Sequence, residues 1–100
     1  MISVLGEIEA MKKLGYRLRQ ERLRRNWSQH DLAGMVGVTL PTYRKIEKGD
    51  GSVEFRHVAR ALGVLGYQEA LGEIIAETQP ELRLKDLLAP ERKHASPRKK

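Results

Sequence analysis

Apolar side chains recur every three or four residues along most of this chain, a spacing that is typical of helices with one buried face. In the first helix, expected over 7–25, Met11, Leu14 and Leu18 form such a stripe. Arg22 continues it. Because an unpaired charge in an apolar interior costs on the order of several kcal/mol, Arg22 needs an acidic partner. The pattern therefore predicts a first helix with a paired charge on its buried face.

The second helix, expected over 29–36, has signals at both ends. Ser28 precedes it and Asp31 follows three residues later, the spacing at which a serine and a carboxylate cap the free N–H groups of a helix. Trp27, just before the cap, is expected to pack back on the helix as core filler. Gly37 comes at the end, where a residue in the left-handed conformation commonly stops a helix.

A third helix should begin two residues later. Thr39 is a suitable N-cap, and Pro41 falls in the first turn, where its missing N–H removes no helical hydrogen bond. Tyr43 and Ile46 give the inward face, and Gly49 ends the helix. Two helices joined by so short a turn must cross steeply, which predicts a helix-turn-helix.

The polar residues of the third helix point outward between its buried positions. They form a donor-rich, cationic face with almost no acid, which suits a groove lined by phosphates. These residues are Thr42, Arg44, Lys45 and Lys48.

Two further helices complete the expected all-α fold. The fourth is expected over 53–62, with Ser52 as its cap and Gly63 at its end, and the fifth over 67–77. The backbone N–H groups of the loop 49–52 could approach a phosphate. The expected core residues of these helices are Val53, Phe55, Val58, Ala61 and Leu62, then Tyr67, Leu71, Ile74 and Ile75.

Past the fifth helix the pattern weakens. The segment 78–88 carries four leucines that first alternate and then pair, namely Leu82, Leu84, Leu87 and Leu88. This fits either a short strand exchanged between subunits or one helical turn packed on the domain. An ordered arm that helps the chain dimerise is favoured.

The last residues, 89–100, have five basic residues, one acid, two prolines and nothing apolar larger than alanine. Such a segment cannot bury enough surface to fold. It is expected either to bind the phosphate backbone or to act only as a solubilising tail. We therefore expect the chain to divide into a helix-turn-helix domain over 1–77, an arm over 78–88 and a disordered basic tail over 89–100.

Composition narrows the possible functions. One hundred residues, 40% hydrophobic and without cysteine, indicate one small domain with neither a disulfide framework nor a cysteine zinc site. His30, His57 and His94 lack metal-binding spacing, and no nucleophile and base pair is visible, so no enzyme activity, metal or cofactor is expected. Glu7 and Glu9 interrupt the apolar start, so neither a signal nor a membrane span is expected and the default location is cytoplasmic. The net charge of +6 favours polyanionic partners.

The stretch 28–49 follows the pattern SQxxLAxxxGVTxxTxxxIExG. In this it resembles the helix-turn-helix family of the phage lambda repressor and Cro type, often called the XRE family, whose members are small sequence-specific DNA-binding regulators. The resemblance covers about 14–75 and implies a five-helix domain that binds double-stranded DNA. One glycine between two helices would be a weak match, but eight residues in joint spacing are specific: Gln29, Leu32, Ala33, Gly37, Val38, Ile46, Glu47 and Gly49.

The resemblance implies structural roles for three residues. Arg22 and Glu47 would form an ion pair that locks the first helix to the third; the alternative is that both are solvated surface charges. Gln29 would bind a phosphate and also brace the third helix, which in this family is the recognition helix that contacts the bases. The alternative is that Gln29 is only a generic residue at a helix start.

The resemblance also places base-contacting side chains on the third helix. Arg44 or Lys45 would donate to guanine O6 and N7, and Leu40 would meet a thymine methyl group. The alternative for the two cations is a solvated helix face. Because Leu40 and Pro41 depart from the glutamines of well-known phage repressors, the operator sequence is not carried over.

Phosphate contacts are expected nearby. Thr42, Tyr43 and Lys48 are better placed for phosphates than for bases, although Tyr43 also fits the core. The full set expected at the DNA is Gln29, Thr39, Leu40, Pro41, Thr42, Arg44, Lys45, Lys48 and Ser52.

The predicted function is transcriptional regulation, with repression favoured. A single recognition helix covers only a few base pairs, so a homodimer is expected on an inverted repeat, with half-sites spaced by about 34–36 Å or a multiple of it. The resemblance places the dimer contact around the fourth and fifth helices. Leu65, Tyr67 and Leu71 are candidates for it, although all three could equally be core residues.

Two alternatives stay open. A short repressor-like domain with a basic extension also resembles the antitoxin of a toxin-antitoxin pair, in which the fifth helix and the leucines of 82–88 would meet a protein toxin. The other alternative is a protein-interaction adaptor that uses the helix-turn-helix as a scaffold and has only non-specific DNA affinity.

Overall fold

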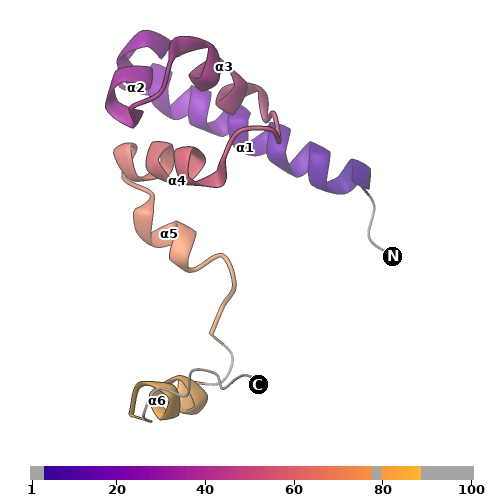
Figure 1. The fold of residues 1–100 in the computed structure, drawn as a ribbon, viewed down its shortest axis with the longest axis vertical. Coiled ribbons are helices and arrows are strands. Elements are labelled where there is room, and N and C mark those ends of the chain that lie inside the picture. Colours follow the sequence, from indigo (N-terminus) through magenta and orange to yellow (C-terminus); the bar gives the residue numbers. More distant parts are fainter. Residues whose placement is uncertain (1–3, 78–79, 89–100) are drawn as a thin grey trace, which may run out of the picture.

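The computed structural model describes residues 4–77 and 80–88, so the expected tail 89–100 lies outside the described residues. Within them the chain forms six helices and no strand, which confirms the predicted all-α class (Figure 1). None of these helices combines the length and the apolar character that crossing a membrane requires. The helices are α1 (Val4–Arg24), α2 (Gln29–Val36), α3 (Leu40–Lys48), α4 (Phe55–Val64), α5 (Gln68–Gly72) and α6 (Pro80–Leu88).

The core lies where α1, α2, α3 and α4 meet. Its two largest fully buried side chains, Tyr43 and Leu32, come from the two helices of the predicted helix-turn-helix. Because α3 is anchored from behind by this core, its opposite side faces solvent. The buried apolar residues are Leu18, Leu32, Ala33, Val36, Tyr43, Ile46, Ala61 and Leu65.

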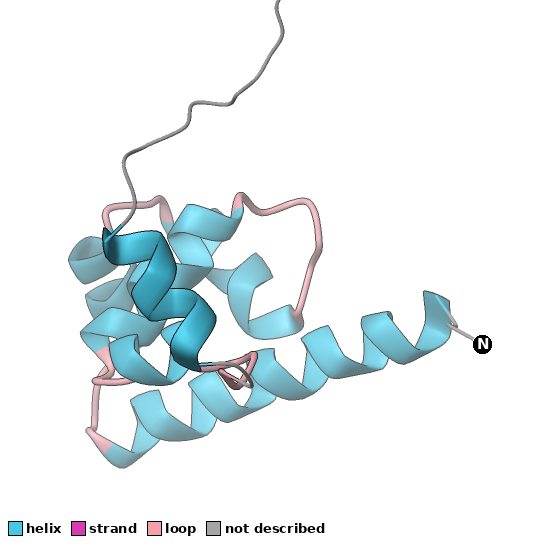
Figure 2. Ribbon diagram, turned by 90° about the horizontal axis from the view of Figure 1, so that it is seen from below, coloured by secondary structure: helices cyan, strands magenta, loops and turns pink. Residues whose placement is uncertain are grey.

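Helix α1 is longer than predicted and buries only part of the predicted stripe: Leu18 and Arg22 are buried as expected. It begins three residues before the predicted start, and its first turns extend past the other helices (Figure 2). Met11 and Leu14, expected to be buried, are exposed, whereas Gly15, Leu18 and Arg22 are buried. The reason is that α1 meets α3 at Gly15, whose missing side chain lets the two backbones approach closely.

Helices α2 and α3 begin and end where the sequence predicts. The Ser28 hydroxyl accepts the Asp31 N–H at 2.9 Å, and the Asp31 carboxylate accepts the Ser28 N–H at 2.8 Å, which completes a capping box. Gly37 stops α2 in the left-handed conformation, with φ of 84°. Thr39 caps α3, and Gly49 stops it with φ of 73°. The predicted helix-turn-helix is confirmed.

Helix α4 starts two residues later than predicted, and Ser52 does not cap it. Glu54 occupies the N-cap position without a side-chain cap hydrogen bond. Ser52 instead donates its N–H to Asp50 Oδ1 at 2.8 Å, which closes a turn before the helix can start. Phe55, expected in the core, is the first residue of α4 and is 64% exposed. Gly63 does not stop the helix, which continues one residue beyond it.

Helix α5 is much shorter than the predicted helix over 67–77. It has five residues and ends at Gly72, where glycine costs a helix about 1 kcal/mol relative to alanine. Ile74 and Ile75, expected in the core, therefore lie beyond the helix and are exposed. Leu65, a candidate for the dimer surface, belongs instead to the core and is 2% exposed.

The segment expected as an arm is helical. Helix α6 has nine residues, so the strand alternative is wrong and the helix is longer than the single turn expected. In Figure 1, α6 stands apart from α1 to α5.

Candidate nucleic-acid interface

The third helix has an anchored face and a free face. Tyr43, Ile46 and Glu47 are buried, whereas Arg44 and Lys45 between them are exposed. The outer face is completed by exposed Pro41 and Lys48 and by half-buried Leu40 and Thr42. The predicted base-contacting cations are thus brought together on one accessible side of α3.

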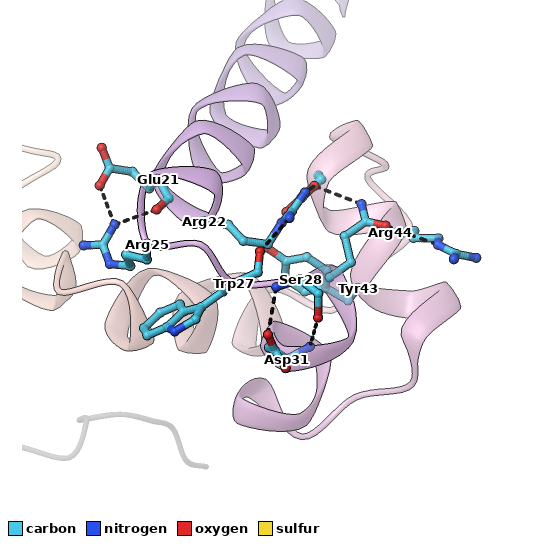
Figure 3. A network of polar contacts seen from close by, with 10 residues as sticks. Glu21, Arg22, Arg25, Trp27, Ser28, Asp31, Tyr43 and Arg44 are labelled. Atoms are coloured by element: carbon cyan, nitrogen blue, oxygen red, sulfur yellow. Dashed lines mark hydrogen bonds and ion pairs between the residues drawn. The ribbon is translucent and has the colours of Figure 1, made fainter.

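The carboxylate of Glu47 joins three helices beneath this face. Arg22 of α1 donates from Nε to Glu47 Oε2 at 2.6 Å and from Nη2 to Oε1 at 3.1 Å (Figure 3). Tyr43 donates its hydroxyl to Oε2 at 2.7 Å, and Gln29 of α2 donates Nε2 to Oε1 at 3.0 Å. The ion-paired side chains are only 7% and 4% exposed. Arg22 and Glu47 therefore lock α1 to α3, and Gln29 adds α2 to the same carboxylate.

The protonation states of this network follow from its contacts. Burial alone would raise the pKa of Glu47, but the hydrogen bonds from Arg22, Tyr43 and Gln29 outweigh it and hold that pKa below its usual value. The hydrogen bond to Glu47 raises the pKa of Arg22. Burial, then the hydrogen bond to Glu47, raises the pKa of Tyr43. The network is thus an ion pair with a neutral phenol as an additional donor. Tyr43 is fully buried, so its expected phosphate contact is wrong.

Gln29 connects this buried network to the surface. Its Nε2 donates to Glu47, and its Oε1 accepts from Nε of Arg44 at 3.3 Å. Figure 3 shows Arg44 reaching outward from this contact. The amide nitrogen of Gln29 has a second N–H that could meet a phosphate. Gln29 thus positions the exposed Arg44 guanidinium through a chain of hydrogen bonds that begins at a buried carboxylate.

Thr39 and Thr42, both expected at the DNA, form the start of the recognition helix. The Thr39 hydroxyl oxygen accepts the Thr42 N–H at 3.3 Å and lies 3.1 Å from the Thr42 hydroxyl. Thr39 remains exposed and Thr42 half-buried, so both lie beside the exposed face of α3.

The loop after α3 differs from its expected role. The Ser52 N–H, proposed for a phosphate, is already bound by the Asp50 carboxylate, so that part of the expectation is wrong. The hydrogen bonds from Ser52, and then the charges of Lys45 and Lys48, lower the pKa of Asp50. Nothing in the sequence pattern had indicated a role for this acid. Ser52 is exposed, and its hydroxyl also hydrogen-bonds the Asp50 carboxylate.

Arg25 is a structural residue that the sequence interpretation missed. Its Nη2 donates to the Leu65 carbonyl oxygen at 2.8 Å, and its Nη1 donates to the Glu21 carboxylate at 2.7 Å. Its guanidinium also lies 5.9 Å from the ring centre of Trp27, which itself packs against the core as predicted. In the sequence, only the i, i+4 spacing of Glu21 and Arg25 could have indicated that these two residues form an ion pair.

Two other groups of residues lie elsewhere on the surface. Of the remaining dimer candidates, Tyr67 is exposed and Leu71 half-buried.

A polar depression of about 330 Å³ lies beside the end of α2 and is lined by Arg56, His57 and Arg60 of α4. No cluster of three or more histidine, aspartate or glutamate side chains suited to a metal occurs within 4–77 and 80–88.

Two short helices joined at a left-handed glycine, the second with a cationic outer face, define a DNA-binding protein of the helix-turn-helix class. A family model described as helix-turn-helix matches residues 18–71, more than half of the chain. The chain therefore belongs to this family and is a DNA-binding transcriptional regulator of the XRE type. Comparisons with curated proteins and with solved structures gave no match.

Proposed function

We propose that the protein is a homodimeric repressor that inserts α3 into the major groove at each half of an inverted repeat. The observation that carries this proposal is the hydrogen-bonded chain from Glu47 through Gln29 to Arg44. A guanidinium held in place before binding loses less freedom when it donates to the O6 and N7 atoms of a guanine. This favours base reading by Arg44 over non-specific attraction alone.

The remaining contacts are assigned by position on α3. Lys45 is the second base-reading cation, and Leu40 and Pro41 at the start of the helix offer apolar contact to a thymine methyl group. The other proposed residues, which would bind phosphates and fix the register, are Gln29, Thr39, Thr42 and Lys48. Ser52 would contribute less, because its hydroxyl already bonds the Asp50 carboxylate.

The dimer follows from the size of the site. One recognition helix covers few base pairs, so two copies are needed for adequate specificity. Tyr67 and Leu71 are the proposed contacts that remain at the surface. We assign DNA binding to 1–77, dimer support to 78–88 and backbone attraction to 89–100. Repression would result from covering a promoter that overlaps the operator.

Selection of bound sequences from a random duplex pool tests this function. The full chain should enrich an inverted repeat whose half-sites lie about one helical turn apart, or a multiple of it. The Lys45→Ala variant should enrich a repeat that is relaxed at one position in each half. Lys13→Ala, which removes the same charge from exposed α1, is the matched control and should enrich the parent sequence. Recovery of no sequence preference by the parent chain would refute the proposal and favour the adaptor.

A second candidate is the antitoxin of a toxin-antitoxin pair. The exposed Ile74 and Ile75 beyond α5 favour it, because adjacent large apolar side chains at a surface often mark a protein contact. Co-expression with the product of the adjacent gene should then yield a stable complex. If operator binding is intact and no complex forms, the antitoxin candidate fails and the repressor stands.

A further inference from the structure

An apolar groove lies on the side of the domain formed by α1, α4 and α5. Its volume is about 480 Å³. Of the residues that line it, Phe55 is 64% exposed and Ile74 is 72% exposed. Groups of large apolar side chains at a surface commonly mark a contact with another chain or segment. The apolar lining consists mainly of Leu14, Phe55, Leu62, Tyr67, Leu71 and Ile74.

Helix α6 exposes large apolar side chains in the single chain. It has nine residues, and helices shorter than about 12–15 residues are marginal in water unless they pack against something. Its Leu87 and Leu88 are 70% and 76% exposed. Packing α6 against an apolar surface would therefore stabilise it, and an apolar segment bound in the groove would bury the exposed side chains there.

We infer that the groove receives α6 of a second copy of this chain, so that two chains exchange their C-terminal helices. This inference rests on the proposed homodimer and names the segment that would hold it together. Ile74 forms part of the groove wall, and α6 begins only six residues later, so each groove lies close to the root of an outgoing α6. In the single chain, α6 stands away from α5 (Figure 1). Reciprocal exchange makes the same contact twice and covers both grooves and both helices.

The charges at the groove are compatible with α6 as the occupant. Arg17 of α1 lines the groove, and the neighbouring acid Glu21 is already bound by Arg24 and Arg25. Helix α6 carries the exposed acids Glu81 and Asp86, which can supply the missing countercharge for Arg17.

Cysteine cross-linking tests the exchange directly, because the chain has no native cysteine. Full-length Phe55→Cys and full-length Leu88→Cys, carrying different tags, are mixed and oxidised. A disulfide-linked pair containing both tags is expected. His30→Cys, at an exposed site on α2, replaces Phe55→Cys as the control and should give little linked product. A second sample, in which one chain carries both Phe55→Cys and Leu88→Cys, separates the two occupants. If this doubly substituted chain forms an internal disulfide and runs as a monomer, α6 occupies its own groove and the inference is wrong.

Sedimentation provides an independent measurement. Replacing Leu87 and Leu88 together by serine should raise the dimer dissociation constant at least tenfold, while circular dichroism shows α1 to α5 intact. Lys85→Ala, on the same helix, should leave that constant close to the parent value. An unchanged dimer in the double serine variant would overturn the exchange. If an inverted repeat is enriched but no cross-link forms, the helix exchange is wrong and the proposed repressor function remains supported. If the cross-link forms but no sequence is enriched, the exchange is supported and the repressor function is wrong.

Discussion

Gly15 of α1 lies directly against the backbone of Glu47 in α3. A Cβ atom at Gly15 would be only 2.8 Å from the Glu47 carbonyl carbon and 2.8 Å from the Ile46 carbonyl oxygen. These are backbone atoms of a helix, so they cannot swing aside as the end of a flexible side chain can. The missing side chain at Gly15 therefore fixes how closely α1 supports the recognition helix, and it does so beside the Arg22–Glu47 ion pair.

We expect Gly15→Ala to push α1 away from α3 and to lower the free energy of unfolding by about 1–3 kcal/mol. Urea denaturation of the full chain measures it. Gly34→Ala is the matched control, because nothing lies within 4 Å of a Cβ at Gly34 in α2. Alanine there should stabilise the helix by about 0.5–1 kcal/mol. Equal unfolding midpoints for the two variants would contradict the close approach.

Removing the Glu47 carboxylate, which joins α1, α2 and α3, should lower the free energy of unfolding more than Gly15→Ala does. Glu47→Ala leaves Arg22 buried without its partner, and breaking a buried pair in this way costs about 3–5 kcal/mol. The melting temperature should therefore fall clearly. Glu54→Ala removes a partner of Arg56 from an exposed ion pair and should change the melt far less. A Glu47→Ala variant that melts like the parent would show that the network does not hold the helices together.

The helix-turn-helix could be predicted because its signals are local. The capping box of Ser28 and Asp31, the N-cap at Thr39 and the two stopping glycines each act within four residues of their partners. In α2 and α3 these local signals were enough to predict where the helices begin and end, whereas Ser52 and Gly63, interpreted in the same way, did not mark the ends of α4. The outer face of α3 followed from them, since Tyr43 and Ile46 had to point inward.

The features that could not be predicted depend on contacts between distant segments. Met11 and Leu14 form a regular stripe, yet α1 turns Gly15 inward because only a glycine fits against α3. Leu65 looks like any other apolar residue at the end of a helix, and its burial depends on how α4 packs against the domain. The bracing of Arg44 by Gln29, fifteen residues earlier in the chain, likewise requires the folded arrangement of α2 and α3.

Acid should weaken the fold through Glu21. Hydrogen bonds from Arg25, then Arg24, lower the pKa of Glu21 from 4.5 to about 2. Since the folded-state pKa lies below the unfolded value, the stabilisation is complete above about pH 4.5 and is lost as the pH falls towards 2. Urea midpoints between pH 5 and pH 2 should therefore fall less steeply for Glu21→Gln than for the parent chain. The lowered pKa of Glu47 acts in the same direction and leaves part of the dependence in the variant. Identical pH profiles would argue against the Glu21 contacts.

Operator binding should depend on Arg44 and, through it, on Gln29. Arg44→Ala should weaken binding to the selected sequence by about 1–3 kcal/mol and relax the preference at one base pair. Gln29→Ala should weaken binding less, and the double variant should lose less than the sum of the two because Gln29 acts partly by holding Arg44. Fluorescence anisotropy at one fixed salt concentration measures all three. Arg19→Ala, an exposed arginine of α1, serves as the control and should leave the base preference unchanged. Strict additivity would mean that Gln29 does not act through Arg44.

The basic tail, 89–100, should contribute to affinity without reading sequence. Replacing its five basic residues by glutamine keeps the length of the chain but removes the charges that can displace counterions from DNA. The slope of log K against log salt should flatten by about 0.9 for each phosphate that the tail no longer neutralises, so the total change can reach roughly 4–5. Affinity should fall on specific and random duplexes alike, and the sequence enriched by selection should not change. Titrations at several salt concentrations provide the measurement. A salt slope equal to that of the parent chain would identify the tail as a solubilising segment that does not touch the DNA backbone.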